Sequence, residues 1–259
     1  MFDYSSIGLA DILPFVAVGF AAQIVDGALG MAFGVLSQTL LVSLLGIPPA
    51  AASASVHLVE IFTTGASGAS HIAHRNVNWK LFWRLVPTGI IGGVTGAYLL
   101  SSIDASAAKP FVMIYLTLIG FYLGYKAIRL NSQPHFKDPQ MTAPLALAGG
   151  FLDAAGGGGW GPVVTSNLLV QGGDPRDTVG TVNAAEFLVT LTISITFLAT
   201  LGLSAFTHAV IGLIIGGVVA APFGAYLAKH LKPRWLLAGV SVVLIATSVF
   251  TIVKAWPIF

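Results

Sequence analysis

Long apolar stretches with almost no charge constrain this chain more than any other feature of its sequence. Within residues 12–59 the only charged residue is Asp26, within 178–228 it is Glu186, and residues 235–253 carry no charge. A helix of roughly 20 apolar residues is long enough to cross the hydrocarbon core of a bilayer, which is about 30 Å thick. Charged residues make up 8% of the chain, against about 25% in a typical soluble domain. The sequence therefore excludes a water-soluble globule and predicts an all-α polytopic protein of the lipid bilayer.

The few polar and charged residues exclude several classes of function. The 12 Lys and Arg residues are balanced by 10 Asp and Glu residues, so no basic face is available for nucleic acid. The chain has no Cys, which excludes disulfides, thiolate-bound metals and iron–sulfur clusters. His71 and His74 have a spacing that a metal accepts, but a solvated turn beside Arg75 is the alternative, and we expect neither a metal nor a cofactor. No Walker loop, His-Glu-x-x-His or Gly-x-Ser-x-Gly motif occurs, so we expect neither an ATP-driven pump nor an enzyme.

Six apolar segments are long enough to be full membrane spans. They comprise residues 51–69, 81–100, 111–127, 179–200, 209–228 and 236–253.

Four shorter apolar segments form two pairs, residues 12–25 with 28–45 and residues 143–152 with 159–170. A helix rises about 1.5 Å per residue, so residues 143–152 reach only about 15 Å, the depth of the bilayer midplane. The joins inside each pair are too short for a polar loop in water. Each pair is therefore predicted to be a re-entrant hairpin or a broken helix, with two short crossings as the alternative.

Lys and Arg residues cluster at alternate junctions between the predicted spans. Cytoplasmic loops carry an excess of Lys and Arg, and placing these four junctions inside leaves only Lys109 and Lys254 outside. Both termini are then extracytoplasmic. The basic residues assigned to the cytoplasmic side are Arg75, Lys80, Arg84, Lys126, Arg129, Lys137, Arg176, Lys229, Lys232 and Arg234.

The two halves of the sequence repeat each other. Placing Asp26 over Asp153 starts an ordered series of matches along both halves. Each half contains a hairpin followed by three spans, and three crossings turn the second copy upside down. We therefore predict a first inverted repeat at 1–130, a cytoplasmic linker at 131–142 and a second repeat at 143–259, the pattern of a secondary transporter with a midplane site. The further matches are Gly30 with Gly157, Gly34 with Gly161, Gly46 with Gly173, Pro48 with Pro175, Ser55 with Thr181, His57 with Asn183, Glu60 with Glu186, and Gly96-Ala-Tyr-Leu99 with Gly224-Ala-Tyr-Leu227.

Four acids lie within the apolar segments as two repeat-related pairs, Asp26 with Asp153 and Glu60 with Glu186. Insertion scales put the cost of a mid-bilayer Asp near about 3 kcal/mol, so such residues face a cavity or a partner. We expect Asp26 and Asp153 to lie in the substrate site, and Glu60 and Glu186 to serve proton coupling or gating. The alternative for the two Glu residues is a structural role as hydrogen-bonded links between helices.

Two glycine-rich runs, residues 26–34 and 153–162, are predicted at the hairpin tips. Glycine lets the backbone break a helix and present bare N–H groups, and a half-helix that begins there suits an anion. Close helix packing at Gly30-x-x-x-Gly34 is the alternative. No Lys or Arg lies within the apolar belt, so dipoles, hydroxyls and amides would hold the anion. The predicted substrate-binding residues are Asp26, Gly27, Gly30, Gly34, Gln38, Ser55, His57, Asp153, Gly157, Gly158, Gly161, Thr181 and Asn183.

His57 is assigned a neutral hydrogen-bonding role rather than a proton relay, because its repeat partner is Asn183.

At these residues the chain resembles the TauE/SafE family of sulfite-exporter-like membrane permeases. The resemblance rests on Asp26-Gly-x-x-Gly-Met-x-x-Gly34, on Ser55-x-His57-x-x-Glu60, and on the second copy with Gly-x-x-Asn183-x-x-Glu186. It covers essentially the whole chain, with a longer glycine run in the second half than in the first. It implies a carrier in the cytoplasmic membrane of a bacterium or archaeon, for small sulfur-containing anions such as sulfite or organosulfonates.

The predicted function is a secondary transporter, and the alternatives differ from it in mechanism rather than in the residues of the site. A passive anion channel would use the same site without saturation or proton coupling. Proton-coupled uptake of another small anion is the second alternative, since the sequence does not fix the direction of transport. An intramembrane enzyme would need a nucleophile–base pair, and the sequence contains no recognisable one.

Overall fold

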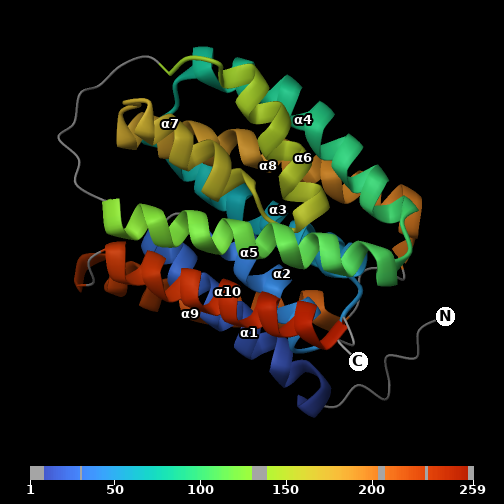
Figure 1. The fold of residues 1–259 in the computed structure, drawn as a ribbon. Helices are drawn as coiled ribbons and strands as arrows, with labels where there is room; N and C mark the ends of the chain where they lie inside the picture. The colour runs from blue at the N-terminus through green and yellow to red at the C-terminus, as the bar shows by residue number, and fades with distance from the viewer. Residues whose placement is uncertain (1–8, 30, 130–138, 204–207, 231–232, 256–259) are drawn as a thin grey trace.

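Helices account for nearly all of the described chain in the computed structural model, which describes residues 9–29, 31–129, 139–203, 208–230 and 233–255 (Figure 1). No strand occurs among these residues. The prediction of an all-α protein is confirmed.

Six long helices each contain one of the predicted spans. Three of them, α4, α5 and residues 177–201 of α8, are long and apolar enough to cross a membrane. Asn78 begins α4 as its N-cap, because its side-chain oxygen accepts a hydrogen bond from Leu81 N at 3.1 Å. The long helices are α3 (Pro49–Ala73), α4 (Trp79–Ser102), α5 (Ala105–Arg129), α8 (Pro175–Leu201), α9 (His208–His230) and α10 (Pro233–Ala255).

The second predicted hairpin has the expected form. Helix α6 (Thr142–Gly156) runs to a break at residues 157–159, after which the chain returns through a π-helix, η2 (Trp160–Thr165), and the short α7 (Ser166–Val170). These bounds agree with the predicted arms at 143–152 and 159–170.

The first hairpin has one longer arm than predicted. Helix α1 (Leu9–Leu29) has 21 residues, so it reaches about 31 Å, and the prediction of a short arm at 12–25 is wrong. A single glycine in a helix costs only about 1 kcal/mol, and α1 therefore continues through Asp26 and Gly27. Helix α1 ends at Leu29, and α2 (Phe33–Ser43) forms the returning arm.

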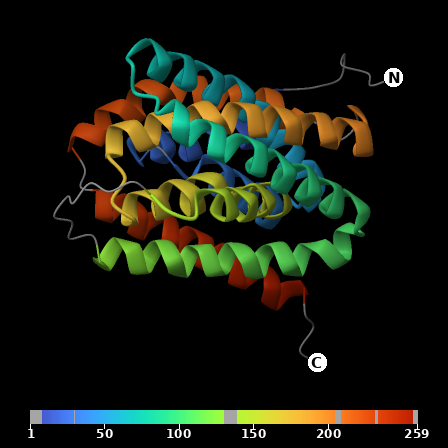
Figure 2. The same cartoon turned by 90° about the horizontal axis from the view of Figure 1, so that it is seen from above.

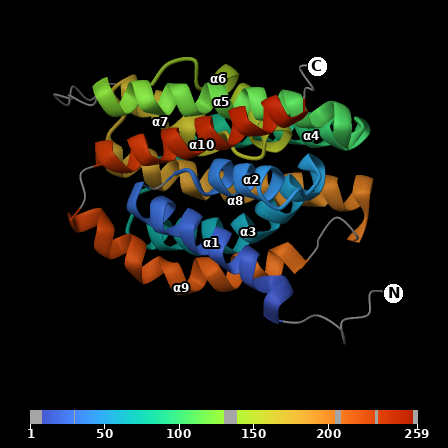
Figure 3. The same cartoon turned by 60° about the horizontal axis from the view of Figure 1, so that its bottom comes forward.

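The helices run along one common direction (Figure 2), and α1 begins at the end of the bundle where α10 ends (Figures 1 and 3). The main helix pairs are α1 with α9, α4 with α6, α5 with α10 and α3 with α8. The first arm of each hairpin touches its long neighbour backbone to backbone. A Cβ on Gly92 would lie 2.0 Å from Leu147 O in α6, and a Cβ on Gly216 would lie 2.1 Å from Val16 O in α1. Glycine at these contacts lets the hairpin arms approach closely enough to place the two tips beside each other.

Candidate functional site

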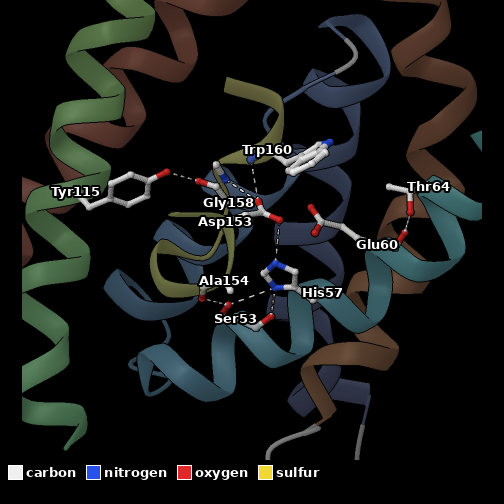
Figure 4. Close-up of polar contacts among 10 residues, drawn as sticks. Ser53, His57, Glu60, Thr64, Tyr115, Asp153, Ala154, Gly158 and Trp160 are labelled. Carbon is white, nitrogen blue, oxygen red and sulfur yellow. Dashed lines mark hydrogen bonds and ion pairs between the residues drawn. The ribbon is translucent and has the colours of Figure 1, made fainter. Parts of the chain in front are cut away.

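Asp153 closes the helix break of the second hairpin. Its Oδ1 accepts hydrogen bonds from the backbone N–H of Gly159 at 2.7 Å and of Trp160 at 3.0 Å (Figure 4). The Tyr115 hydroxyl on α5 donates to Gly158 O at 2.8 Å and holds the same tip from the other side. A carboxyl group therefore occupies the first N–H groups of the returning arm, which we expected to face an anion directly.

Asp26 does the same for the first hairpin, with one hydrogen bond from the residues that the structure describes. Its Oδ1 accepts from the backbone N–H of Phe33 at 3.2 Å. Asp26 and Phe33 are seven residues apart, and so are Asp153 and Trp160, the corresponding residues of the second half. Both acids thus bridge the end of one arm to the start of the next, which fixes each carboxyl group at its hairpin tip.

The two tips touch. Gly158 has φ +146°, and a Cβ there would lie 2.3 Å from Val35 N and 2.6 Å from Gly34 C at the start of α2. A Cβ on Gly161 would lie 2.8 Å from the Cβ of Met31. Only a glycine-rich second tip can approach the first hairpin this closely, and this contact brings the two predicted glycine runs into one site.

His57 lies behind Asp153, on α3. Its Nε2 is 3.2 Å from Asp153 Oδ2, and its Nδ1 is 2.7 Å from the backbone oxygen of Ser53 (Figure 4). The Ser53 hydroxyl donates to Ala154 O at 2.8 Å, which ties α3 to α6. The His57 side chain is fully buried and its ring lies 6.2 Å from that of Phe197.

A cavity of about 240 Å³ opens between the hairpin tips, α3 and α8. All four predicted acids line it, and Figure 4 shows the Glu60 carboxyl pointing toward Asp153. Glu60 is 6% exposed, and its Oε2 has no hydrogen-bond partner. The predicted site residues that line this cavity are Asp26, Gly34, Glu60, Asp153, Gly158, Gly161, Asn183 and Glu186.

Other predicted substrate-binding residues lie outside the cavity lining, where they support the surrounding structure. Gln38 donates from Nε2 to Pro49 O at 3.1 Å, and Gly157 sits against its side chain. Thr181 accepts a hydrogen bond from Asn78 N at 2.8 Å through its hydroxyl. Ser55 is fully buried.

Two of the predicted glycines have surroundings that the structure does not describe. Gly27 belongs to the last turns of α1. Gly30 lies outside the described residues.

Several polar residues that line the cavity were missed by the sequence analysis. Thr64, Ser67 and His71 follow Glu60 along one face of α3, and Gln23 precedes Asp26 by three residues on α1. Residues three or four apart share a helix face, so this spacing from Glu60 was the available signal. Thr63 completes the set, and together these side chains supply further hydroxyl and amide donors to the cavity.

The cavity has an acidic character. Among the described residues that line it, none is Lys or Arg, and the titratable groups are Asp26, Glu60, Asp153, Glu186 and His71. No group of three or more His, Asp and Glu residues in the described part of the chain is arranged to hold a metal ion. The arrangement can exchange hydrogen bonds and protons with a small polar solute.

Comparison with known proteins gives two matches that span this site. The family model described as "Sulfite exporter TauE/SafE" matches residues 15–251. A relative from Bacillus subtilis (strain 168), "Probable membrane transporter protein YtnM", is 40% identical over 255 residues, which cover 95% of this chain and 84% of the relative. No solved structure matches the chain. Both matches cover the two hairpin tips and the cavity between them.

Proposed function

The chain belongs to the sulfite exporter TauE/SafE family of membrane transporters, and on this premise we propose that it exports small sulfur-containing anions such as sulfite or organosulfonates. Transport proceeds by alternating access around the cavity between the hairpin tips. The protein lies in the cytoplasmic membrane of a prokaryotic cell. The observation that carries the proposal is this one polar cavity, which joins both glycine runs to all four intramembrane acids.

The size of the cavity supports a small substrate. Sites for drug-sized ligands have volumes of about 300–1,000 Å³, and this cavity has about 240 Å³. The hydroxyls of Thr63, Thr64 and Ser67 and the amides of Gln23 and Asn183 supply donors around it. An oxyanion is bound by such donors, and no fixed cation is required.

The acids of the cavity support a link between anion and protons. A second negative charge about 4 Å from an ionised carboxyl is opposed by about 4 kcal/mol at an effective dielectric constant near 20. An anion therefore enters favourably only when Glu60 and Glu186 carry protons. This assigns the two Glu residues to proton coupling, and the unpartnered Oε2 of Glu60 is available to the substrate as an O–H donor.

The pairing of helices supports two inverted repeats. If the halves correspond, α1 matches α6 and α4 matches α9. Helix α3 then matches α8, and α5 matches α10. Exchange of the halves then turns the α1–α9 pair into the α6–α4 pair, and returns α3–α8 and α5–α10 to themselves. Each hairpin enters the bundle and leaves it at the same end. The first hairpin uses one end of the bundle and the second uses the opposite end (Figures 1 and 3).

The orientation follows from the positive-inside rule. Arg75, Lys80 and Arg129 lie at one end of the bundle, where α3 ends, α4 begins and α5 ends, and we assign this end to the cytoplasm. Thr64, Ser67 and His71 extend the cavity lining toward that end of α3. The cavity then faces the cytoplasm, as an exporter needs in order to load its substrate.

A passive channel is the less favoured mechanism. An ion that left the cavity away from the cytoplasm would have to pass Ser53, His57 and Phe197, all fully buried. Passage requires these packed side chains to separate, which is a conformational step and not simple diffusion.

Flux measurements in proteoliposomes test the proposal. We expect saturable flux of sulfite or sulfoacetate that changes when a pH gradient is imposed, with empty liposomes as the control. Flux that does not saturate and ignores the gradient would favour a channel, and the absence of flux for every sulfur oxyanion would refute the substrate class.

The orientation is tested by labelling cysteines introduced into this Cys-free chain. We expect a membrane-impermeant maleimide to label Pro48→Cys from outside intact cells. Asp177→Cys should be labelled only after the cells are opened. The reverse pattern would invert the topology and make the cavity face outward.

A further inference from the structure

We propose that His57 and Asp153 together hold one transferable proton, and that movement of the second hairpin delivers this proton from one side of the membrane to the other. The inference rests on the proposed transport function and deepens it. It also changes the role of His57, from a neutral partner of the substrate to part of the coupling machinery.

The surroundings of His57 determine which of its ring nitrogens carries a hydrogen. Nδ1 lies 2.7 Å from the backbone oxygen of Ser53, and a carbonyl oxygen can only accept. The Ser53 hydroxyl hydrogen is given to Ala154 O at 2.8 Å, so Ser53 Oγ, which lies 3.3 Å from Nδ1, also faces it as an acceptor. Both neighbours therefore require a hydrogen on Nδ1.

The other ring nitrogen of His57, Nε2, faces the carboxyl group of Asp153. In the neutral ring with its hydrogen on Nδ1, Nε2 is an acceptor, and it lies 3.2 Å from Asp153 Oδ2. An ionised carboxyl is also an acceptor only, and Asp153 Oδ1 already accepts from the N–H groups of Gly159 and Trp160. The contact between Oδ2 and Nε2 is favourable only with a proton between them, either as an O–H of Asp153 or as an N–H of His57.

The cavity gives access to this shared proton on the side of Asp153. Asp153 lines the cavity, whereas His57 is fully buried behind it against Phe197. Among the described residues, the titratable groups around Asp153 are Glu60 on α3, Glu186 on α8, Asp26 on α1 and Tyr115 on α5, with His71 farther along α3. A proton reaches the pair from the cavity, and none of these neighbours is a fixed cation that would replace it.

The two groups that share the proton lie on different elements, which links the proton to the conformational change. Asp153 is part of the tip of the second hairpin, while His57 belongs to α3. Any movement that withdraws the tip from α3 separates Oδ2 from Nε2 and removes the reason for a shared proton. The O–H or N–H bond then breaks, and the proton passes to water on the side to which the site has opened.

In the described part of the first hairpin and its neighbours, an amide stands where the second has the titratable ring of His57. Asn183, the repeat partner of His57, donates from Nδ2 to Val179 O at 2.9 Å, as His57 Nδ1 donates to Ser53 O. An amide keeps this backbone contact but does not take up a proton near neutral pH. The pair therefore contributes one proton per chain, from the second hairpin alone.

Nitrogen-15 NMR of histidine-labelled protein in detergent tests the shared proton without any substrate. The His57 signals are assigned by their loss in His57→Gln. We expect a hydrogen on Nδ1 in the wild type and a proton shared between Nε2 and Asp153 Oδ2. In Asp153→Asn, an amide N–H takes the place of the shared proton, so Nε2 should be an acceptor only. A hydrogen on Nε2 with a bare Nδ1, in the wild type, would overturn the proposal.

Flux in proteoliposomes tests the coupling. We expect the ratio of initial rates with and without a pH gradient to fall from roughly fivefold or more in the wild type to about onefold in Asp153→Asn. The matched control is Asp26→Asn at the other tip, which should lower flux but keep the ratio. If Asp153→Asn does not fold, His57→Asn provides the same comparison.

The outcomes separate the two proposals. An unchanged ratio in both Asp153→Asn and His57→Asn would refute the proton pair while leaving the transport function intact. No flux in the wild type would refute the proposed substrate, and the NMR result would still decide whether the pair holds a proton.

Discussion

The tips of the two hairpins use related acids in unequal surroundings. Within the described part of the chain, Asp26 accepts one backbone hydrogen bond, from Phe33, whereas Asp153 accepts two and also contacts His57. The residue that corresponds to His57 in the other half is Asn183, which bonds to its own helix in the same way. The comparison separates two roles of the acid: both tips need it to close a helix break, and only the second tip adds a titratable partner.

The difference extends to how each tip meets the other. At Gly158 the second hairpin has a backbone that rests on Gly34 and Val35, while the corresponding residue of the first hairpin is Met31. The first tip keeps side chains and forms one wall of the cavity. The second tip gives up side chains in order to approach that wall, which accounts for its longer glycine run.

The largest expected effect follows from adding one methyl group at this contact. Gly158→Ala places a Cβ 2.3 Å from Val35 N at φ +146°, so overpacking and backbone strain together should cost on the order of 2–5 kcal/mol. Thermal unfolding in detergent measures the loss. Gly239→Ala is the control, because a Cβ on that α10 glycine meets nothing within 4 Å, and it should be neutral or slightly stabilising. An equal loss in both variants would show that the tip contact has no special role.

Removal of the two acids should give a smaller and unequal effect. Asp153→Ala leaves the N–H groups of Gly159 and Trp160 and the ring of His57 without their partner, at a cost of roughly 2–4 kcal/mol. Of the described residues, Asp26→Ala leaves the Phe33 N–H without its partner, at a cost of about 1–2 kcal/mol. Unfolding midpoints of the two variants provide the comparison. Equal costs would mean that the hairpins are closed by the same interactions, contrary to the geometry.

The sequence predicted the places of these acids but not their bonds. Charge-free segments predicted all six long helices, and the Asp-containing glycine runs predicted both tips. A hydrogen bond across seven residues depends on how the broken backbone turns. The local sequence around Asp26 and Asp153 does not predict that turn. The length of α1 was missed for a related reason, since Gly27 was read as a break where the helix continues.

The candidate site shows the same limit. Glu60, Glu186 and Asn183 line the cavity, whereas Thr181 accepts a hydrogen bond from the backbone N–H of Asn78. Thr181 and Asn183 are only two residues apart on α8 and so point to different sides of that helix. Which side faces the cavity is set by the packing of α3 against α8, and the sequence alone does not contain that angle.

Glu60→Gln tests the role of the cavity acids while changing little volume. We expect the ratio of flux with and without a pH gradient to fall from roughly fivefold or more in the wild type toward a value of one. The unfolding midpoint should change little, because no hydrogen bond to Oε2 is lost. Glu186→Gln is the repeat-related comparison and should act in the same direction. A large loss of folded protein with an unchanged ratio would instead favour a structural role between helices.

The smallest expected effect comes from giving the first hairpin what only the second possesses. Asn183→His can retain the bond to Val179 O through Nδ1 and places a titratable nitrogen in the cavity lining. An added group that titrates near neutral pH should make the pH dependence of flux steeper while the maximal rate changes by less than about threefold. The reciprocal change, His57→Asn, gives both related positions an amide and should make the dependence shallower. Initial rates measured across a pH series with equal pH on both sides of the liposome decide the matter. If both substitutions leave the slope unchanged, the difference between the hairpins is one of packing alone.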